Sequence, residues 1–276
     1  EIFAPAVRSK IGLGKCTAEA WGTVMWVAHS LGMFTSATMM FGHIEGHADR
    51  IHHMHLVRQW QDAAHFAASR HDAEYSSPRG HYKAFISWPF QRENTPLGRL
   101  RNWGQDPEEL GREFPGDTVA TLDGSGTKDL HPEFGRRVRM SGSTDYLRTQ
   151  AVSRLMLDNI YSIGASWVTM GPHIGQVALS FGANDMGSVM MEENVVSSAG
   201  TTYCLDEAVL CMLIRGAGFT PGQRDNAYDL LRLHTGPDSP DLRVTDWSTH
   251  RARKLHVQTA PTIESAPVEL TASARA

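Results

Sequence analysis

Two glycines bound the run FTSATMMF at residues 34–41, which is short and apolar. A run of this length and polarity indicates a buried strand. Apolar residues recur at helical spacing before it, over 17–32, and after it, from 49 to about 70, and Thr17 is placed to cap the first helix. A buried strand between two helices predicts parallel strand pairing with the helices packed outside the sheet.

The same alternation continues along most of the chain. Further strands are expected at 82–88 (YKAFISW), 164–170 (GASWVTM) and 183–191 (ANDMGSVMM), and Glu1-Ile2 are the expected end of an earlier strand. Helices are expected at 143–160, 172–182, 206–217 and 222–233. Four strand–helix units predict an α/β fold that is part of a barrel over residues 1–234.

Two segments do not follow this rhythm. Residues 99–142 are rich in Gly, Arg and Asp and predict a long insertion between a strand and a helix. Residues 235–276 are polar and aperiodic and predict a mostly disordered tail.

Composition narrows the class of protein. The 276 residues are 41% hydrophobic and 20% charged, with a net charge of −4, which argues against a nucleic-acid-coating role. We find no apolar run near the roughly 20 residues of a membrane span. Three cysteines, at positions 16, 204 and 211, fit a reducing compartment, so we expect a cytoplasmic protein.

Candidate site residues follow the predicted strands, because parallel α/β barrels place their active sites at the carboxyl ends of strands. We expect a small-molecule pocket at this edge. Its candidate catalytic residues are His43, Glu45, Glu192 and Glu193, and its candidate pocket residues are Thr38, Trp88, Gln91, Trp167, Asn184, Asp185 and Ser188.

Each candidate has a structural alternative. A histidine close to a carboxylate, as with His43 and Glu45, suits proton transfer near neutral pH, but the histidine is equally able to cap a helix or bond backbone. Glu192 and Glu193 suit a helix N-terminus as well as a pocket. The two tryptophans, Trp88 and Trp167, either stack on an aromatic ligand or pack in the core.

Metal and thiol chemistry receive little support. Seven histidines lie between His43 and His71, but their spacing is not that of H-E-x-x-H, and we expect mostly solvated helix faces and no metal site. The cysteines have no C-x-x-C spacing, and none is placed as a nucleophile with a histidine behind it.

Four segments carry a family resemblance: TSATMMFGHIE at 35–45, AFISWPFQRENTPL at 84–97, SWVTMGPHIG at 166–175 and GANDMGSVMMEENVVSSAG at 182–200. Together they resemble the radical S-adenosylmethionine enzymes of the menaquinone pathway, which include the futalosine cyclases, aminofutalosine synthase and, as a relative, the tyrosine-using half of FO synthase. The tryptophan and glutamine of WPFQ favour the cyclases.

The resemblance implies a (β/α)8 TIM-barrel-type fold with a 4Fe–4S cluster and S-adenosylmethionine as cofactors. It further implies that dehypoxanthine futalosine is closed to a cyclic product, with an electron donor such as flavodoxin or ferredoxin. The alternatives are another radical enzyme of the same group, which joins two substrates, and a non-catalytic half-barrel that only binds or scaffolds.

This sequence departs from the family in one decisive respect. Cluster binding requires the spacing C-x-x-x-C-x-x-C, and no such triplet is present. We therefore expect a C-terminal half barrel that is inactive by itself. Smaller departures are the insertion at 99–142 and Ser188, where the group often has a second glycine.

Overall fold

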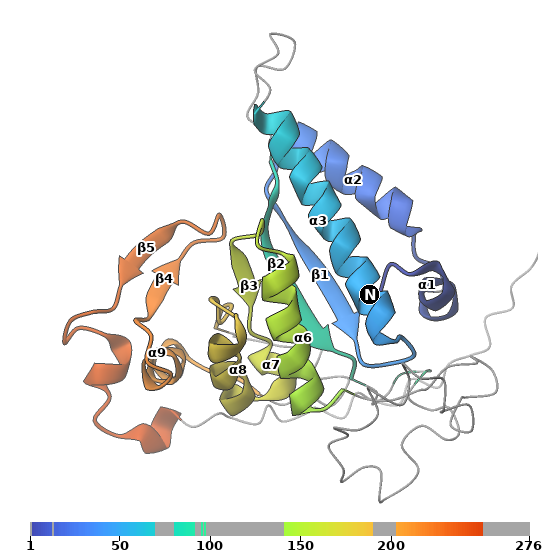
Figure 1. Ribbon diagram of the computed structural model, residues 1–276. Coiled ribbons are helices and arrows are strands. Elements are labelled where there is room, and N and C mark those ends of the chain that lie inside the picture. Colours follow the sequence, from blue (N-terminus) through green and yellow to red (C-terminus); the bar gives the residue numbers. More distant parts are fainter. Residues whose placement is uncertain are drawn as a thin grey trace, which may run out of the picture.

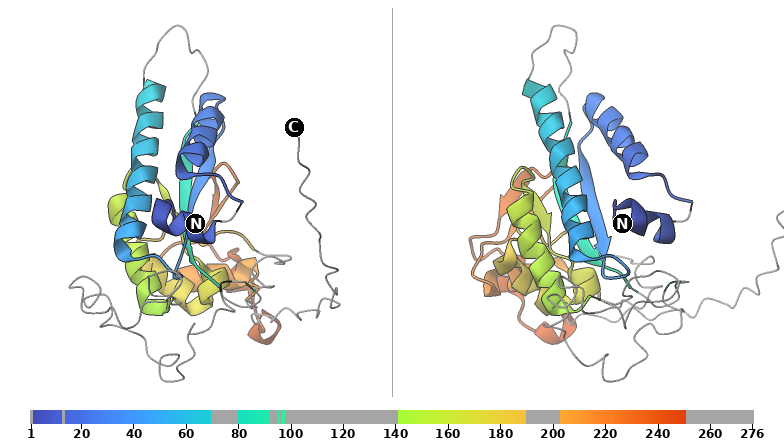
Figure 2. Two further views of the ribbon diagram at one scale, coloured as in Figure 1. Left: turned by 90° about the vertical axis from the view of Figure 1, so that its right-hand side faces the viewer. Right: turned by 45° about the vertical axis from the view of Figure 1, so that its right-hand side comes forward.

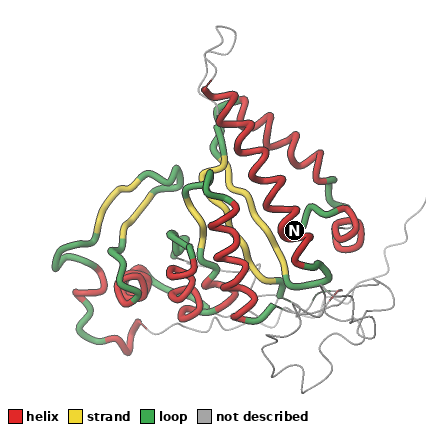
Figure 3. Tube along the Cα trace, viewed as in Figure 1, coloured by secondary structure: helices red, strands yellow, loops and turns green. Residues whose placement is uncertain are grey.

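The computed structural model describes residues 2–12, 14–69, 80–91, 95, 97, 141–189 and 203–250. Figures 1 and 3 show a parallel sheet flanked by helices, with a separate small hairpin beyond its last strand. The α/β class predicted from the sequence is confirmed. The expected insertion, 99–142, lies outside the described residues except for 141 and 142.

Three parallel strands form the sheet in the order β1(Thr35–Phe41), β2(Tyr82–Pro89) and β3(Ser162–Gly164). Helix α3(His47–Ser69) follows β1, and α6(Ser143–Met156) precedes β3. This is the strand–helix alternation that the apolar runs predict, because parallel neighbours need a crossover connection. Within the described residues the sheet is open and does not close into a barrel.

The two faces of the sheet differ in burial. Alternate residues of β1, namely Ala37, Met39 and Phe41, are fully buried. Arg50 of α3 lies 4.5 Å above the Phe41 ring, so this set faces α3. Figure 1 shows α3 and α6 on one face of the sheet. The opposite face carries half-buried side chains, and strand register places them in pairs. The pairs are Thr38 beside Ile86 and Met40 beside Trp88.

Helix α6 packs on the sheet through polar side chains. Gln150 is fully buried, donates to the Gly164 carbonyl at 3.1 Å and accepts from the Ser87 hydroxyl at 3.2 Å. The apolar spacing predicts that Leu155 faces inward, but its side chain is 79% exposed. Hydrogen bonds to the sheet therefore fix the rotation of this helix, and the predicted inward position of Leu155 is wrong.

The N-terminal segment packs beside β1 and α3, as the two turned views in Figure 2 show. It contains α1(Pro5–Ile11) and α2(Ala18–Ser30), and the Thr17 hydroxyl caps α2 as predicted by accepting from Ala20 N–H at 3.1 Å. Phe3 is buried and stacks on His53 of α3, with ring centroids 4.1 Å apart. Ile2 is buried in a loop, so the strand expected there is absent from the described residues.

Two expected strands differ from the structure. Residues 167–170 form the short helix α7(Trp167–Met170), and only residues 162–164 of this region are extended in β3. Of the next expected strand, 183–191, the structure describes residues 183–189, and these form one parallel bridge, between Gly164 and Asp185. Between them lie α8(Pro172–Ala178) and the 3₁₀ helix η3(Leu179–Phe181), which ends at Gly182 as predicted.

The C-terminal part begins with α9(Glu207–Gly216), which confirms the helix expected at 206–217. The helix expected at 222–233 is wrong, because this segment forms the antiparallel hairpin β4(Gly222–Arg224) and β5(Leu230–Leu233).

Residues 235–250, which were expected to belong to a disordered tail, contain the 3₁₀ helices η5(Pro240–Arg243) and η6(Trp247–His250). The rest of that segment lies outside the described residues. No helix in the described ranges has the length and apolarity needed to cross a membrane.

Candidate active site

The loop Gly42–Gly46 continues β1 at its carboxyl end and leads into α3. Its histidine, His43, is 2% exposed, and the side chain of Glu45 is completely buried. Trp88 lies at the same end of the neighbouring strand, because its register partner is Met40 and Phe90 N–H donates to the Phe41 carbonyl at 2.6 Å. The strand-end rule therefore places these candidates together.

Glu45 is held by backbone donors of its own loop and by a cation. Its Oε1 accepts from Gly42 N–H at 2.6 Å and from Arg50 Nε at 2.8 Å, and its Oε2 accepts from His43 N–H at 2.9 Å. Three donors to one carboxylate are enough to compensate for its burial. Glu45 thus acts first as the residue that shapes the loop.

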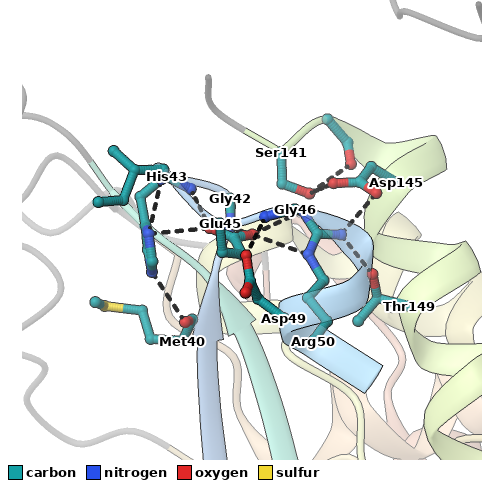
Figure 4. A network of polar contacts seen from close by, with 12 residues as sticks. Met40, Gly42, His43, Glu45, Gly46, Asp49, Arg50, Ser141, Asp145 and Thr149 are labelled. Atoms are coloured by element: carbon teal, nitrogen blue, oxygen red, sulfur yellow. Dashed lines mark hydrogen bonds and ion pairs between the residues drawn. The ribbon is translucent and has the colours of Figure 1, made fainter. Parts of the chain in front are cut away.

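Arg50, on the first turns of α3, joins this loop to α6. Its Nη1 donates to Asp145 at 2.8 Å and to the Thr149 hydroxyl at 2.9 Å, while its Nη2 lies 2.8 Å from Glu45 Oε1. The guanidinium also sits 4.5 Å above the Phe41 ring. Figure 4 shows Arg50 between the two carboxylates. The five-donor fork of arginine suits this bridging position, which lysine cannot fill equally.

Electrostatics keep Glu45 ionised. Burial by itself raises the pKa of Glu45, but the charge and hydrogen bond of His43, the charge of Arg50 and the Gly42 N–H together outweigh it. The pKa of Glu45 therefore lies well below its usual range. A carboxylate that stays charged at neutral pH can stabilise a proton on a neighbouring histidine.

The His43 ring faces this carboxylate with one nitrogen. Nδ1 lies 2.9 Å from Glu45 Oε2, and Nε2 lies 3.3 Å from the Met40 carbonyl. The edge of Phe90 is close to the ring, with centroids 6.0 Å apart. The carboxylate thus orients the imidazole, as in histidine–carboxylate pairs that carry out acid–base chemistry.

Close backbone packing fixes the loop against the start of α6. Gly42 has φ +82°, and a Cβ at this position would lie 2.6 Å from Ser141 Cβ. The Ser141 hydroxyl donates to Asp145 at 2.9 Å, and Asp145 receives Arg50. The network therefore connects the end of β1 to the residues that enter α6.

The other pocket candidates on the sheet lie near this loop. Thr38 and Trp88 are half-buried on the sheet face opposite α3 and α6. Gln91 follows β2 and is half-buried, and its side chain donates to the Pro89 carbonyl at 3.2 Å. Thr38, Trp88 and Gln91 thus offer a hydroxyl, an indole and an amide on the side of the sheet that is less covered.

Trp167 has a core environment. It is 1% exposed, and its indole N–H donates to the Met186 carbonyl at 2.6 Å. Of the two alternatives raised for this residue, core packing agrees with the burial and the satisfied N–H.

The residues near the expected fourth strand are occupied by structural contacts. Asn184 accepts from Ile163 N–H and from Arg154, both at 2.8 Å, so it replaces a missing strand partner. The Asp185 carboxylate accepts from Gly187 N–H and pairs with Arg224 of the hairpin. Ser188 is exposed. The acidic pair Glu192 and Glu193 lies outside the described residues.

A 4Fe–4S cluster does not fit the cysteines of this chain. Cys16 is exposed, Cys204 is half-buried and Cys211 is buried. Cys16 is far from the other two in the sequence, and none of the three has the C-x-x-x-C-x-x-C spacing. Burial raises the pKa of Cys211 to about 11, with further contributions from nearby acids, and this opposes the thiolate that a cluster needs. Among the residues that the structure describes, no three His, Cys, Asp or Glu side chains gather as a metal site.

Sequence reasoning missed the partners of Glu45. Arg50, Asp145 and Thr149 are ordinary surface residue types on helices, and 95 residues separate Arg50 from Asp145. The only local signal was an acid and a base five positions apart at the start of a helix, Glu45 and Arg50, which is common in proteins.

Comparisons with known proteins agree with the resemblance. Residues 130–236 match the family model for the CofH/MqnC C-terminal region. The chain is 35% identical over 232 residues to "Cyclic dehypoxanthine futalosine synthase" of Halalkalibacterium halodurans, covering 84% of this chain and 48% of the relative.

Two further relatives have different names. "Aminodeoxyfutalosine synthase" of Thermus thermophilus is 32% identical, with 84% of this chain and 50% of the relative covered. "5-amino-6-(D-ribitylamino)uracil--L-tyrosine 4-hydroxyphenyl transferase" of Methanopyrus kandleri is 31% identical, with coverage of 85% and 51%. The chain thus spans about half the length of the curated relatives it matches.

Proposed function

We propose that this chain forms the substrate-binding part of a radical S-adenosylmethionine enzyme that cyclises dehypoxanthine futalosine. The match of residues 130–236 to the family model for the CofH/MqnC C-terminal region supports the proposal. The similarity to cyclic dehypoxanthine futalosine synthase over 84% of the chain supports this choice of substrate.

The observation that carries the proposal is the buried His43–Glu45 pair at the carboxyl end of β1, beside Trp88 of β2. Closing a new bond onto an aromatic ring leaves a proton on the ring carbon that must be removed to restore aromaticity, so a base near the substrate is useful. His43 is the group that takes the proton, and Glu45 stabilises the imidazolium that results. Thr38, Trp88 and Gln91 bind the substrate on the adjoining face of the sheet.

The three cysteines of this chain do not fit a cluster, so no radical step is assigned to its residues. The roles of the site residues are substrate binding and proton transfer. Anaerobic treatment of the 276-residue chain with iron and sulfide should yield no stoichiometric cluster by iron analysis and absorbance. Stoichiometric iron would show that the chain binds a cluster after all, and would require ligands other than a cysteine triplet.

Substrate binding is testable without turnover. Dehypoxanthine futalosine should quench the tryptophan fluorescence of the chain saturably, and W88F should abolish most of that change. Trp247, on helix η6, provides the matched control, and W247F should retain the change.

The same titration with tyrosine separates the cyclase from the transferase whose name includes L-tyrosine. Saturable binding of tyrosine alone would favour a reaction of the transferase kind. Binding of neither compound would favour a half-barrel that only scaffolds.

A further inference from the structure

The Nδ1 atom of His43 has two neighbours that require opposite protonation states. Ile44 N–H donates to it at 2.8 Å, which needs a lone pair on Nδ1. Glu45 Oε2 lies 2.9 Å away and only accepts, so it needs a hydrogen on the same atom. Both demands cannot be met at once.

The second ring nitrogen does not share this conflict. Nε2 faces the Met40 carbonyl at 3.3 Å, and a carbonyl only accepts. Nε2 therefore carries hydrogen in either state. A neutral ring with hydrogen on Nε2 satisfies Ile44 N–H, whereas an imidazolium satisfies Glu45.

The two carboxylate oxygens of Glu45 have different hydrogen-bond partners. Oε1 receives Gly42 N–H and two nitrogens of Arg50, each of these at 2.8 Å or less, whereas Oε2 receives His43 N–H and faces Nδ1. Figure 4 shows the carboxylate between the imidazole and the guanidinium. Positive charge on Arg50 therefore reduces the negative charge that Glu45 presents to His43.

We propose that Arg50 is a positioning residue that sets the proton occupancy of His43 through Glu45. Its side chain is 8% exposed, so solvent screens its effect on Glu45 only weakly. Arg50 also bonds Asp145 and Thr149 of α6, so its distance from Glu45 is fixed by the packing of two helices.

Other charged or titratable groups surround the network from each packed element. Within α3 they are His47, whose pKa burial and Arg50 lower, and Asp49, which accepts from Gly46 N–H at 2.9 Å. From α6 they are Asp145 and Arg148, both of which interact with His47. Among these, only Arg50 bonds both Glu45 and Asp145 in the described contacts, so it is the group to vary.

The test is a pH titration of the full chain labelled with ¹⁵N-histidine, in which H43Q identifies the His43 ring signals. R50Q should raise the midpoint of His43 by about one pH unit or more, a tenfold change in proton affinity, because Glu45 then faces His43 without a competing cation. R50K retains a charge but cannot bond both carboxylates, and its midpoint should lie between those of the unmodified chain and R50Q.

E45Q tests the same link from the other side and keeps the shape of the side chain. It should lower the midpoint of the His43 titration. The ring should then remain in the neutral Nε2–H form over more of the pH range, and ¹⁵N shifts distinguish this form from the imidazolium. R58Q is the matched control, since Arg58 lies on the same helix but pairs with Asp158, whose side chain is 68% exposed. R58Q should leave the His43 midpoint unchanged.

Two results would overturn the inference: a His43 midpoint in folded R50Q equal to that in R58Q, or no change in E45Q. If circular dichroism shows that R50Q does not fold, R50K decides, and a His43 midpoint in R50K equal to that in R58Q would overturn the inference. The inference rests on the proposed function in one respect, namely that the proton on His43 comes from the substrate. Because no substrate is present in the titration, its failure is distinct from a failure of the fluorescence experiment.

Discussion

Replacing Arg50 with methionine should destabilise the fold far more than replacing an exposed arginine on the same helix. The change leaves the Glu45 carboxylate, with 0% side-chain exposure, without its cation, and it removes the bonds to Asp145 and Thr149. Breaking a buried pair by removing one partner costs about 3–5 kcal/mol. We therefore expect R50M to lose about 4 kcal/mol of unfolding free energy.

Urea denaturation followed by circular dichroism measures this loss. With a slope of about 2 kcal/mol per molar urea, the midpoint should fall by about 2 M. R58Q breaks a pair whose acid is largely exposed and should cost under about 1 kcal/mol. The double variant E45Q/R50M should recover about 2 kcal/mol relative to the sum of the single variants, because no unpaired buried charge remains.

The pH dependence of this stabilisation follows from the depressed pKa of Glu45. The stabilisation is present above the pKa of the unfolded chain, about 4.3, and is lost as pH falls toward the lower folded value. An R50M variant no less stable than R58Q at pH 7, or single-variant losses that simply add, would refute the buried-pair reasoning.

Three further predictions concern other parts of the fold. Burial, followed by the charges of two neighbouring histidines, lowers the pKa of His29 to about 4, so its contribution is present above pH 6.5 and lost as pH falls through 4. Stability should fall over that range, and H29Q should make this fall smaller, because His29 is one of several histidines with lowered pKa values. G42A should cost about 2 kcal/mol because φ is +82° there, while G142A, with open space around it and φ −83°, should cost almost nothing by urea denaturation. W167F leaves the buried Met186 carbonyl without its donor and should cost about 2 kcal/mol in the same assay, and a loss below 0.5 kcal/mol would contradict the hydrogen bond.

Local sequence determined the order of the main elements. The run at 34–41 and the run at 82–88 are short, apolar and bounded by turn residues, and both are strands, β1 and β2. Thr17 and the spacing after it specify α2, and the apolar spacing of 206–217 specifies α9. These signals are local because burial of one face requires only the periodicity of the element itself.

Pairing between distant segments decided the remaining elements. The segment 164–170 has the composition of a strand, but Trp167 turns into the core as part of α7 and donates to Met186. The segment 222–233 has apolar residues that suit a helix, yet it pairs with itself as a hairpin whose Arg224 holds Asp185. Short segments have no strong preference, so tertiary partners select between the alternatives.

The candidate site shows the same division. The strand-end rule located His43, Glu45 and Trp88 from sequence alone, since parallel strands bring their carboxyl ends to one edge. The sequence could not show that Glu45 is a fully buried acid bound by Arg50, or that Arg50 reaches Asp145, 95 residues away. Those contacts depend on the packing of α3 against α6, and it is this packing that gives an ordinary surface pair of residues a buried, low-dielectric environment.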